Sequence, residues 1–150
     1  IGNIWGGKMA DKMGPIKALS IIFSGLATIL VIFNFTAVNP IAAVITILVW
    51  GAFAFGNVPG LQVYVVSLAQ KYTPDAVDVA SGLNIAAFNV GIALGSWGGG
   101  LIVANAGLMH TPWVGAVIVV IALALTRFSG SLDKKTNASK NAQVSIQASS

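Results

Sequence analysis

The chain has 150 residues, of which 56% are hydrophobic and 8% charged, and its formal net charge is +4. It contains no cysteine, which excludes disulfides, thiolate metal sites and cysteine nucleophiles. Its few basic residues are not interleaved with aromatic residues, as a nucleic-acid-binding surface would require. The composition indicates an all-α protein in a lipid bilayer, with no nucleic-acid partner.

Most of the chain consists of four apolar segments, about residues 16–38, 41–70, 75–106 and 112–129. A hydrocarbon core of about 30 Å needs about 20 apolar helical residues to cross it. We therefore predict four transmembrane helices within residues 18–129. Lysine and arginine occur before or at the start of the first segment, between the second and third, and at or after the end of the fourth, which predicts that both ends are cytoplasmic. The expected location is the cell (inner or plasma) membrane, with several passes.

Prolines mark the helix boundaries independently of hydropathy, because proline suits the first helical turn. Pro15, Pro40, Pro74 and Pro112 each stand near the start of an apolar segment. Pro59 alone lies inside one, where it removes a backbone hydrogen bond. The second helix should therefore be kinked or partly unwound there.

The two ends of the chain differ in character. Residues 1–17 begin with Ile rather than Met and look like the end of a membrane helix followed by a cytoplasmic loop, so we expect the chain to be a fragment. Residues 130–150 are polar and rich in Ser, Asn, Lys and Gln. Such a composition lacks the apolar residues needed to offset ordering entropy, which predicts a disordered cytoplasmic tail.

The most specific motif is Gly7-Lys8-Met9-Ala10-Asp11-Lys12-Met13-Gly14-Pro15-Ile16-Lys17, of the form G-x-x-x-D-[RK]-x-G-x-x-[RK]. Gly7 permits close helix approach, Gly14 can adopt a positive φ, and Asp11 can accept hydrogen bonds from a helix N-terminus. A gating loop that includes Lys12 is one interpretation. The alternative is a basic turn with an incidental aspartate.

Followed by four spans, this motif resembles the signature loop of the major facilitator superfamily, found between helices two and three and again between helices eight and nine. The second copy fits four spans and a polar tail, so the resemblance implies helices nine to twelve of a C-terminal half. The segment from Pro74 to Asn84 and the repeat Gly91-x-x-x-Gly95-x-x-x-Gly99 are similar to the eleventh helix of bacterial sugar-efflux and drug–proton antiporters.

Small residues spaced by four on one side of the third segment predict helix packing, because close backbone approach drives association in lipid. Gly91, Gly95 and Gly99 are the packing candidates, and direct solute contact is the alternative.

Four residues are candidates for solute binding: Asn57 and Tyr64 on the second segment, and Asn84 and Phe88 on the third. Amides at membrane depth need a partner or a wet cavity, and aromatic rings with an occasional amide suit amphipathic or sugar-like solutes. The alternative is a packed interior with satisfied polar groups.

The resemblance implies the C-terminal portion of a secondary transporter, with proton-coupled efflux of a small sugar or drug-like solute by alternating access. Its partners would be the solute, protons, the lipid bilayer and the missing N-terminal half, which should also hold the coupling acid. No catalytic residue, metal ligand set or cofactor motif stands in the spans, so an enzyme is not expected. The alternative function is a small structural or assembly subunit of a membrane complex.

Overall fold

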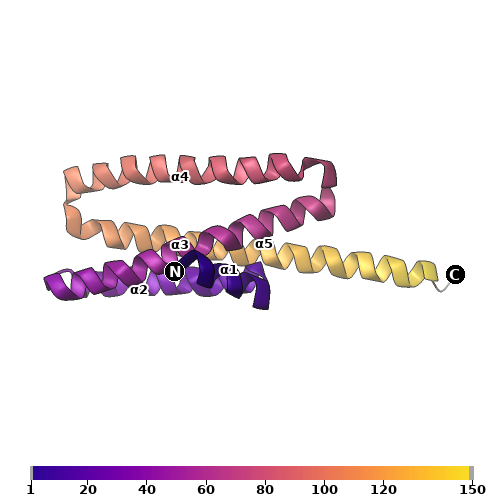
Figure 1. Ribbon diagram of the computed structural model, residues 1–150, viewed down its shortest axis with the longest axis horizontal. Helices are drawn as coiled ribbons and strands as arrows, with labels where there is room; N and C mark the ends of the chain where they lie inside the picture. The colour runs from indigo at the N-terminus through magenta and orange to yellow at the C-terminus, as the bar shows by residue number, and fades with distance from the viewer. Residues whose placement is uncertain (1, 149–150) are drawn as a thin grey trace.

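The computed structural model describes the backbone of residues 2–148, and the side chains except those of residues 137 and 140–148. It contains five α-helices: α1 (Gly2–Met13), α2 (Pro15–Thr36), α3 (Pro40–Tyr72), α4 (Val77–Ala106) and α5 (Thr111–Ala148). Short 3₁₀ turns, η1 (Pro74–Ala76) and η2 (Leu108–His110), precede α4 and α5. No strand occurs in the described backbone (Figure 1). The all-α prediction is confirmed.

Four helical segments are long and apolar enough to cross a membrane: Pro15–Thr36, Pro40–Tyr72, Pro74–Ala106 and Leu108–Thr136. They coincide with the four predicted spans. Asn39 caps α3 as its sequence suggests, because its Oδ1 accepts hydrogen bonds from the backbone N–H groups of Ile41 (3.0 Å) and Ala42 (3.2 Å). The prolines therefore predicted the starts of the helices to within a few residues.

Pro59 lies inside α3, which remains helical from Pro40 to Tyr72. The predicted partial unwinding is therefore not observed, and the alternative, a kink at Pro59, stays a prediction. A helix at this depth keeps its other backbone hydrogen bonds because lipid offers no alternative partners.

The C-terminal segment also departs from expectation. Residues 130–148 continue α5 as helix to Ala148, where a disordered tail was predicted. The apolar span has already nucleated the helix, so each further residue adds a hydrogen bond without a nucleation cost. The segment has no proline, and it contains good helix formers such as Leu132, Lys134 and Lys135. Residues 149–150 lie outside the described part.

The packed centre of the structure is α2, which lies against both α3 and α5. Leu19, Ile22, Phe23 and Leu26 of α2 form a buried cluster. Phe53 and Leu61 of α3 and Val119 and Leu123 of α5 pack against that cluster. Helix α2 is therefore covered on two sides by the other spans.

Helix α1 crosses α3 at very short range through glycine. A Cβ atom at Gly6 would overlap the carbonyl oxygen of Gly56, and one at Gly2 would overlap that of Ala52. Beside this crossing, the rings of Trp5 and Phe53 meet edge to face with centroids 5.1 Å apart. Small residues spaced by four on both helices let the backbones approach, which is the usual means of helix association in lipid.

Helix α4 stands apart from this cluster. Figure 1 shows it beside the packed helices, at a distance from α2 and joined to α3 and α5 at its two ends, while α5 extends well beyond it. None of its 30 residues is buried. The space between α4 and the packed helices is where the candidate sites are found.

Candidate functional site

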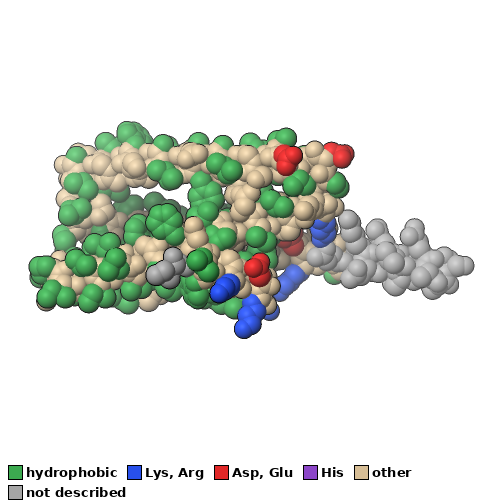
Figure 2. Space-filling view, viewed as in Figure 1, with side chains coloured by type: hydrophobic (Ala, Val, Ile, Leu, Met, Phe, Trp, Pro, Cys, Tyr) green, Lys and Arg blue, Asp and Glu red, His purple; other side chains and the backbone are tan. Residues whose placement is uncertain are grey.

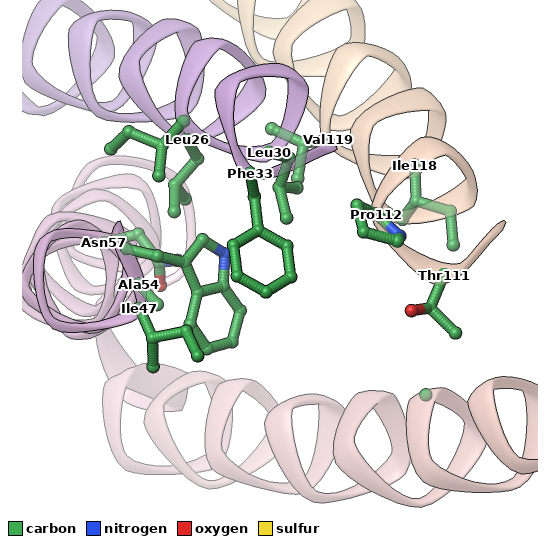
Figure 3. A pocket seen from close by; sticks show the side chains of 14 residues that line it. Leu26, Leu30, Phe33, Ile47, Ala54, Asn57, Thr111, Pro112, Ile118 and Val119 are labelled. Carbon is green, nitrogen blue, oxygen red and sulfur yellow. The ribbon is translucent and has the colours of Figure 1, made fainter. Parts of the chain in front are cut away.

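The larger cavity lies between α2, α3, α4 and the start of α5, and has a volume of about 730 Å³. Figure 3 shows the 14 residues that line it, with the rings of Phe33 and Trp50 and the side chain of Ile118 bordering the space. Trp50, Asn57 and Thr111 are the lining residues with polar side-chain groups. An apolar chamber with a few polar groups can orient an amphipathic guest but offers few partners to a strongly hydrated one.

Asn57 lines this cavity, and one of its side-chain atoms lacks a hydrogen-bond partner. Its Oδ1 is buried and has no hydrogen-bond partner among the described residues. An amide oxygen in apolar surroundings costs free energy unless it accepts a hydrogen bond. The Oδ1 of Asn57 therefore has an unmet need for a hydrogen-bond donor among the described residues.

A second cleft, of about 610 Å³, lies between α3 and α4. Trp50 borders this cleft as well as the larger cavity, and Leu61 lies farther along α3. From α4 the cleft is lined by Asn84 and Phe88, with Gly91 beside them. Two of the four predicted solute-binding residues thus come together here.

Polar side chains link α3 and α4 at this second cleft. The Nδ2 of Asn84 donates to the Oε1 of Gln62 (2.6 Å), and the Nε2 of Gln62 donates to the Oγ of Ser81 (2.5 Å). Gln62 is not among the candidates predicted from the sequence, because it falls off the face of α3 that carries Asn57 and Tyr64. The signal that could have found it is the need of Asn84 for a partner at that depth.

Tyr64 lines neither cavity, and its hydroxyl forms hydrogen bonds with side chains of α5. It donates to the Oδ2 of Asp133 (2.7 Å) and lies 2.7 Å from the Oγ of Ser129, both on α5. This cluster joins the ends of α3 and α5. The structure therefore gives Tyr64 a helix-linking contact and separates it from Asn84 and Phe88.

The signature segment differs from the predicted loop. Gly7, Asp11 and Lys12 belong to α1, and the chain turns only at Gly14, whose φ of 83° agrees with its predicted freedom. Lysine, methionine and alanine, which are good helix formers, make up most of residues 8–13, and no proline interrupts them, so the helix continues to Met13. A Cβ at Gly7 would lie an ordinary 3.8 Å from Pro59, so the close approach is made by Gly6.

The described part of the chain makes no packing contact with the predicted packing glycines of α4. No other described part of the chain lies within 4 Å of the Cβ position at Gly91, Gly95 or Gly99. Gly95 borders the larger cavity, and Gly91 borders the second cleft. Their packing role stays a prediction that needs a surface from outside these residues.

Charged side chains gather at one end of the bundle. Figure 2 shows the described Lys, Arg and Asp side chains in one half of the view, around the α1–α2 turn and the junction of α3 with α4. The opposite turns, at Asn39 and at His110, carry no Lys, Arg, Asp or Glu. Among the residues that the structure describes, no group of His, Cys, Asp and Glu could hold a metal ion.

Four apolar helices with buried polar links and apolar cavities between them define a polytopic α-helical membrane protein. The family model described as "Major Facilitator Superfamily" matches residues 1–149. The chain therefore belongs to this superfamily.

Curated relatives agree with this assignment. The chain is 53% identical over 135 residues to the uncharacterized MFS-type transporter YtbD of Bacillus subtilis (strain 168). The matched region is 90% of the chain and 34% of YtbD. It is 37% identical over 139 residues to the inner membrane transport protein YdhP of Escherichia coli (strain K12). That match covers 91% of the chain and 34% of YdhP. A probable sugar efflux transporter of Helicobacter pylori (strain P12) is 36% identical over 90 residues. That match covers 60% of the chain and 22% of the relative.

The chain spans about a third of the length of the first two of these relatives. No solved structure matches it.

Proposed function

We propose that the chain is the C-terminal portion, helices nine to twelve, of a secondary transporter that exports a small solute by alternating access. The superfamily match, the four spans and the transporter names of the relatives support this proposal. In such transporters two helical halves rock about a site near the middle of the membrane. The remaining helices would come from the part of the transporter outside these 150 residues.

The observation that carries the proposal is the cleft between α3 and α4. Amide and aromatic side chains, Asn84 and Phe88, face a space of about 610 Å³ beside the Gln62–Ser81 hydrogen bond. Hydrogen-bonding groups beside aromatic rings suit a solute with both a polar and an apolar part. We assign solute contact to this cleft and place Tyr64 in the link between α3 and α5.

Orientation follows from the charges. All eight Lys and Arg residues lie near the α1–α2 turn, the α3–α4 junction or the C-terminal part of α5. This is the pattern of a cytoplasmic side, which would place both ends of the chain in the cytoplasm of a cell with an inner or plasma membrane. Exposed Asp11 and Lys12, with the turn at Gly14, would then form a cytoplasmic gating segment.

Protons are the proposed coupling ion. The four aspartates, Asp11, Asp75, Asp78 and Asp133, all lie toward the charged end of the bundle. Coupling acids in transporters lie at membrane depth. We therefore propose that the coupling acid belongs to another part of the complete transporter.

Transport by the complete protein in liposomes with an internal pH dye tests this function. A sugar such as lactose and a lipophilic cation such as tetraphenylphosphonium serve as probe solutes, and at least one should cause a pH change. Replacing Asn84 with alanine should raise the KM about tenfold, because one lost hydrogen bond contributes about 1.4 kcal/mol.

Asn105→Ala is the matched control, because Asn105 lies on the same helix but donates to its own helix, to the carbonyl of Leu101 (2.8 Å). Equal KM values for the Asn84 and Asn105 variants would remove Asn84 from the solute site. No solute-driven pH change with any probe solute would contradict proton-coupled transport.

A further inference from the structure

Gln62 of α3 is the middle member of the polar link between α3 and α4, yet it does not line the cleft beside that link. Both ends of its amide are used, because Oε1 accepts from Asn84 Nδ2 (2.6 Å) and Nε2 donates to Ser81 Oγ (2.5 Å). Ser81 and Asn84 stand three residues apart on α4 and therefore share one face of that helix. Of the three linked residues, only Asn84 lines the cleft. Gln62 can therefore influence the cleft through Asn84.

The link determines which atom of the Asn84 amide is left over. Its Nδ2 is held by Gln62, whereas its Oδ1 has no hydrogen-bond partner among the described residues. This oxygen keeps accessible surface, unlike the buried Oδ1 of Asn57. An amide oxygen is an acceptor with two lone pairs. Because Asn84 borders the cleft, this acceptor is available to a solute there.

The orientation of the Asn84 amide is coupled to that of Gln62. If the Asn84 amide alone turned over, its oxygen would face the oxygen of Gln62, and two acceptors would meet. Gln62 would have to turn as well, which would place its own oxygen against Ser81 Oγ and require Ser81 to become the donor. Asn84 can therefore withdraw its oxygen from the cleft only when all three groups reverse together.

The rest of the cleft favours an uncharged ring. Trp50 of α3 and Phe88 of α4 border it from two different helices, and the other lining residues apart from Asn84 are aliphatic or glycine. None of the described residues that line it is Lys, Arg, Asp or Glu. Burial of an unpaired charge in such surroundings costs far more free energy than burial of a hydrogen-bonded polar group. Aromatic side chains offer contact area to the face or edge of a ring, and the volume of about 610 Å³ leaves space for one.

We propose that Gln62 is a positioning residue that holds the Asn84 Oδ1 toward the solute, so that the cleft selects an uncharged ring carrying an N–H or O–H donor. Gln62 itself does not touch the solute. The inference rests on the proposed function, because it takes this cleft as the solute site, and it adds the chemical class of the solute. A ring without a donor would leave the Asn84 oxygen unpaired.

Indole and benzofuran test this selection, because they have nearly the same shape and only indole carries a donor, its N–H. Ala87 borders the cleft, and this chain contains no cysteine. Ala87→Cys in a cysteine-free form of the complete transporter therefore supplies a single thiol in the cleft. N-ethylmaleimide labels this thiol, and a bound probe slows the labelling. The dependence of the labelling rate on probe concentration gives an apparent Kd for each probe.

Indole should bind about tenfold more tightly than benzofuran, the difference that one hydrogen bond supplies. Gln62→Met keeps the length of the side chain but removes both hydrogen bonds, so the ratio of the two Kd values should fall below about threefold. Gln62→Glu keeps an acceptor for Asn84 Nδ2 and should restore a ratio near tenfold. Gln70 is exposed and lies two turns farther along α3, so Gln70→Met is the matched control and should leave the ratio unchanged.

The ratio separates positioning from stability, because a general loss of packing weakens the binding of both probes alike. A tenfold ratio that persists in the Gln62→Met variant would overturn the positioning role. A ratio near one with Gln62 in place would overturn the selection of a donor, and protection by neither probe would overturn both.

The solute-driven pH change in liposomes tests the proposed function separately. Transport of a probe solute together with a Kd ratio near one would refute this inference alone. A tenfold ratio that depends on Gln62, without transport of any probe solute, would contradict the proposed function and leave the selectivity of the cleft intact.

Discussion

Helices α2 and α4 are both long and apolar enough to cross a membrane, yet they differ completely in packing. Six residues of α2 are buried against its neighbours, and none of α4 is. Because lipid tails are as apolar as leucine, hydrophobicity places both helices in the bilayer without deciding which helices associate. Association depends instead on complementary shape and on polar links. Helix α2 finds complementary surfaces on α3 and α5, whereas α4 meets α3 through a polar link and has no buried residue.

The largest expected effect is on the free energy of unfolding, when a leucine of α2 or of α4 is replaced with alanine. Leu19 of α2 is fully buried, and Leu94 of α4 is 62% exposed. Leu19→Ala should lower the free energy of unfolding in mixed micelles by about 2–5 kcal/mol, because the neighbours cannot fill the space left behind. Leu94→Ala should change it by less than about 0.5 kcal/mol. Similar losses for both variants would show that α4 is packed in the isolated chain.

A somewhat smaller effect is expected from overpacking at glycine. Gly6→Leu would force a side chain into the backbone of Gly56 and should cost about 1–3 kcal/mol, with release of α1 from α3. Gly99→Leu in the same chain should be tolerated, since no other described part of the chain lies within 4 Å of the Cβ position at Gly99. Trp5 fluorescence reports the α1–α3 contact through its packing on Phe53, provided that the other tryptophans are replaced. An unchanged Trp5 signal in the Gly6 variant would contradict this crossing.

The sequence predicted the helices well because the relevant signals are local. Hydropathy and length select the spans, and Asn39 and the prolines near each start define the boundaries. Predictions failed where neighbouring structure decides the outcome. Helix α1 continues through the signature motif to Met13, and α5 continues to Ala148, because each extends a helix that is already formed.

The candidate site was predicted only in part because helix faces do not specify partners. Tyr64 projects from the same side of α3 as Asn57, but its hydroxyl meets Asp133 of α5, a contact between residues 69 positions apart. Gln62 was undervalued because its importance depends on Asn84, which lies on another helix. No single-helix pattern contains such pairings. The expectation that α4 packs against protein came from its glycines, and it stays a prediction, because no described residue from another part of the chain lies within 4 Å of their Cβ positions.

The smallest effect concerns the polar link that joins α4 to α3. The single replacements Gln62→Ala and Asn84→Ala and their combination form a double-mutant cycle on the free energy of unfolding. We expect a coupling of about 0.6 kcal/mol, with an upper bound of about 1.7 kcal/mol, as found for hydrogen bonds between membrane helices. Pairing Gln62→Ala with Asn105→Ala should give no coupling, because Asn105 donates to its own helix.

A coupling near zero for Gln62 and Asn84 would mean that their hydrogen bond does not hold α4 in place, since water or a micelle headgroup would then replace it at no cost. Helix α4 would in that case be positioned only by its two connections, at Pro74–Ala76 and Leu108–His110. A measurable coupling would instead show that α4 is fixed at the charged end while its glycine-rich remainder is still without a partner. That arrangement would keep Asn84 and Phe88 of α4 in register with α3.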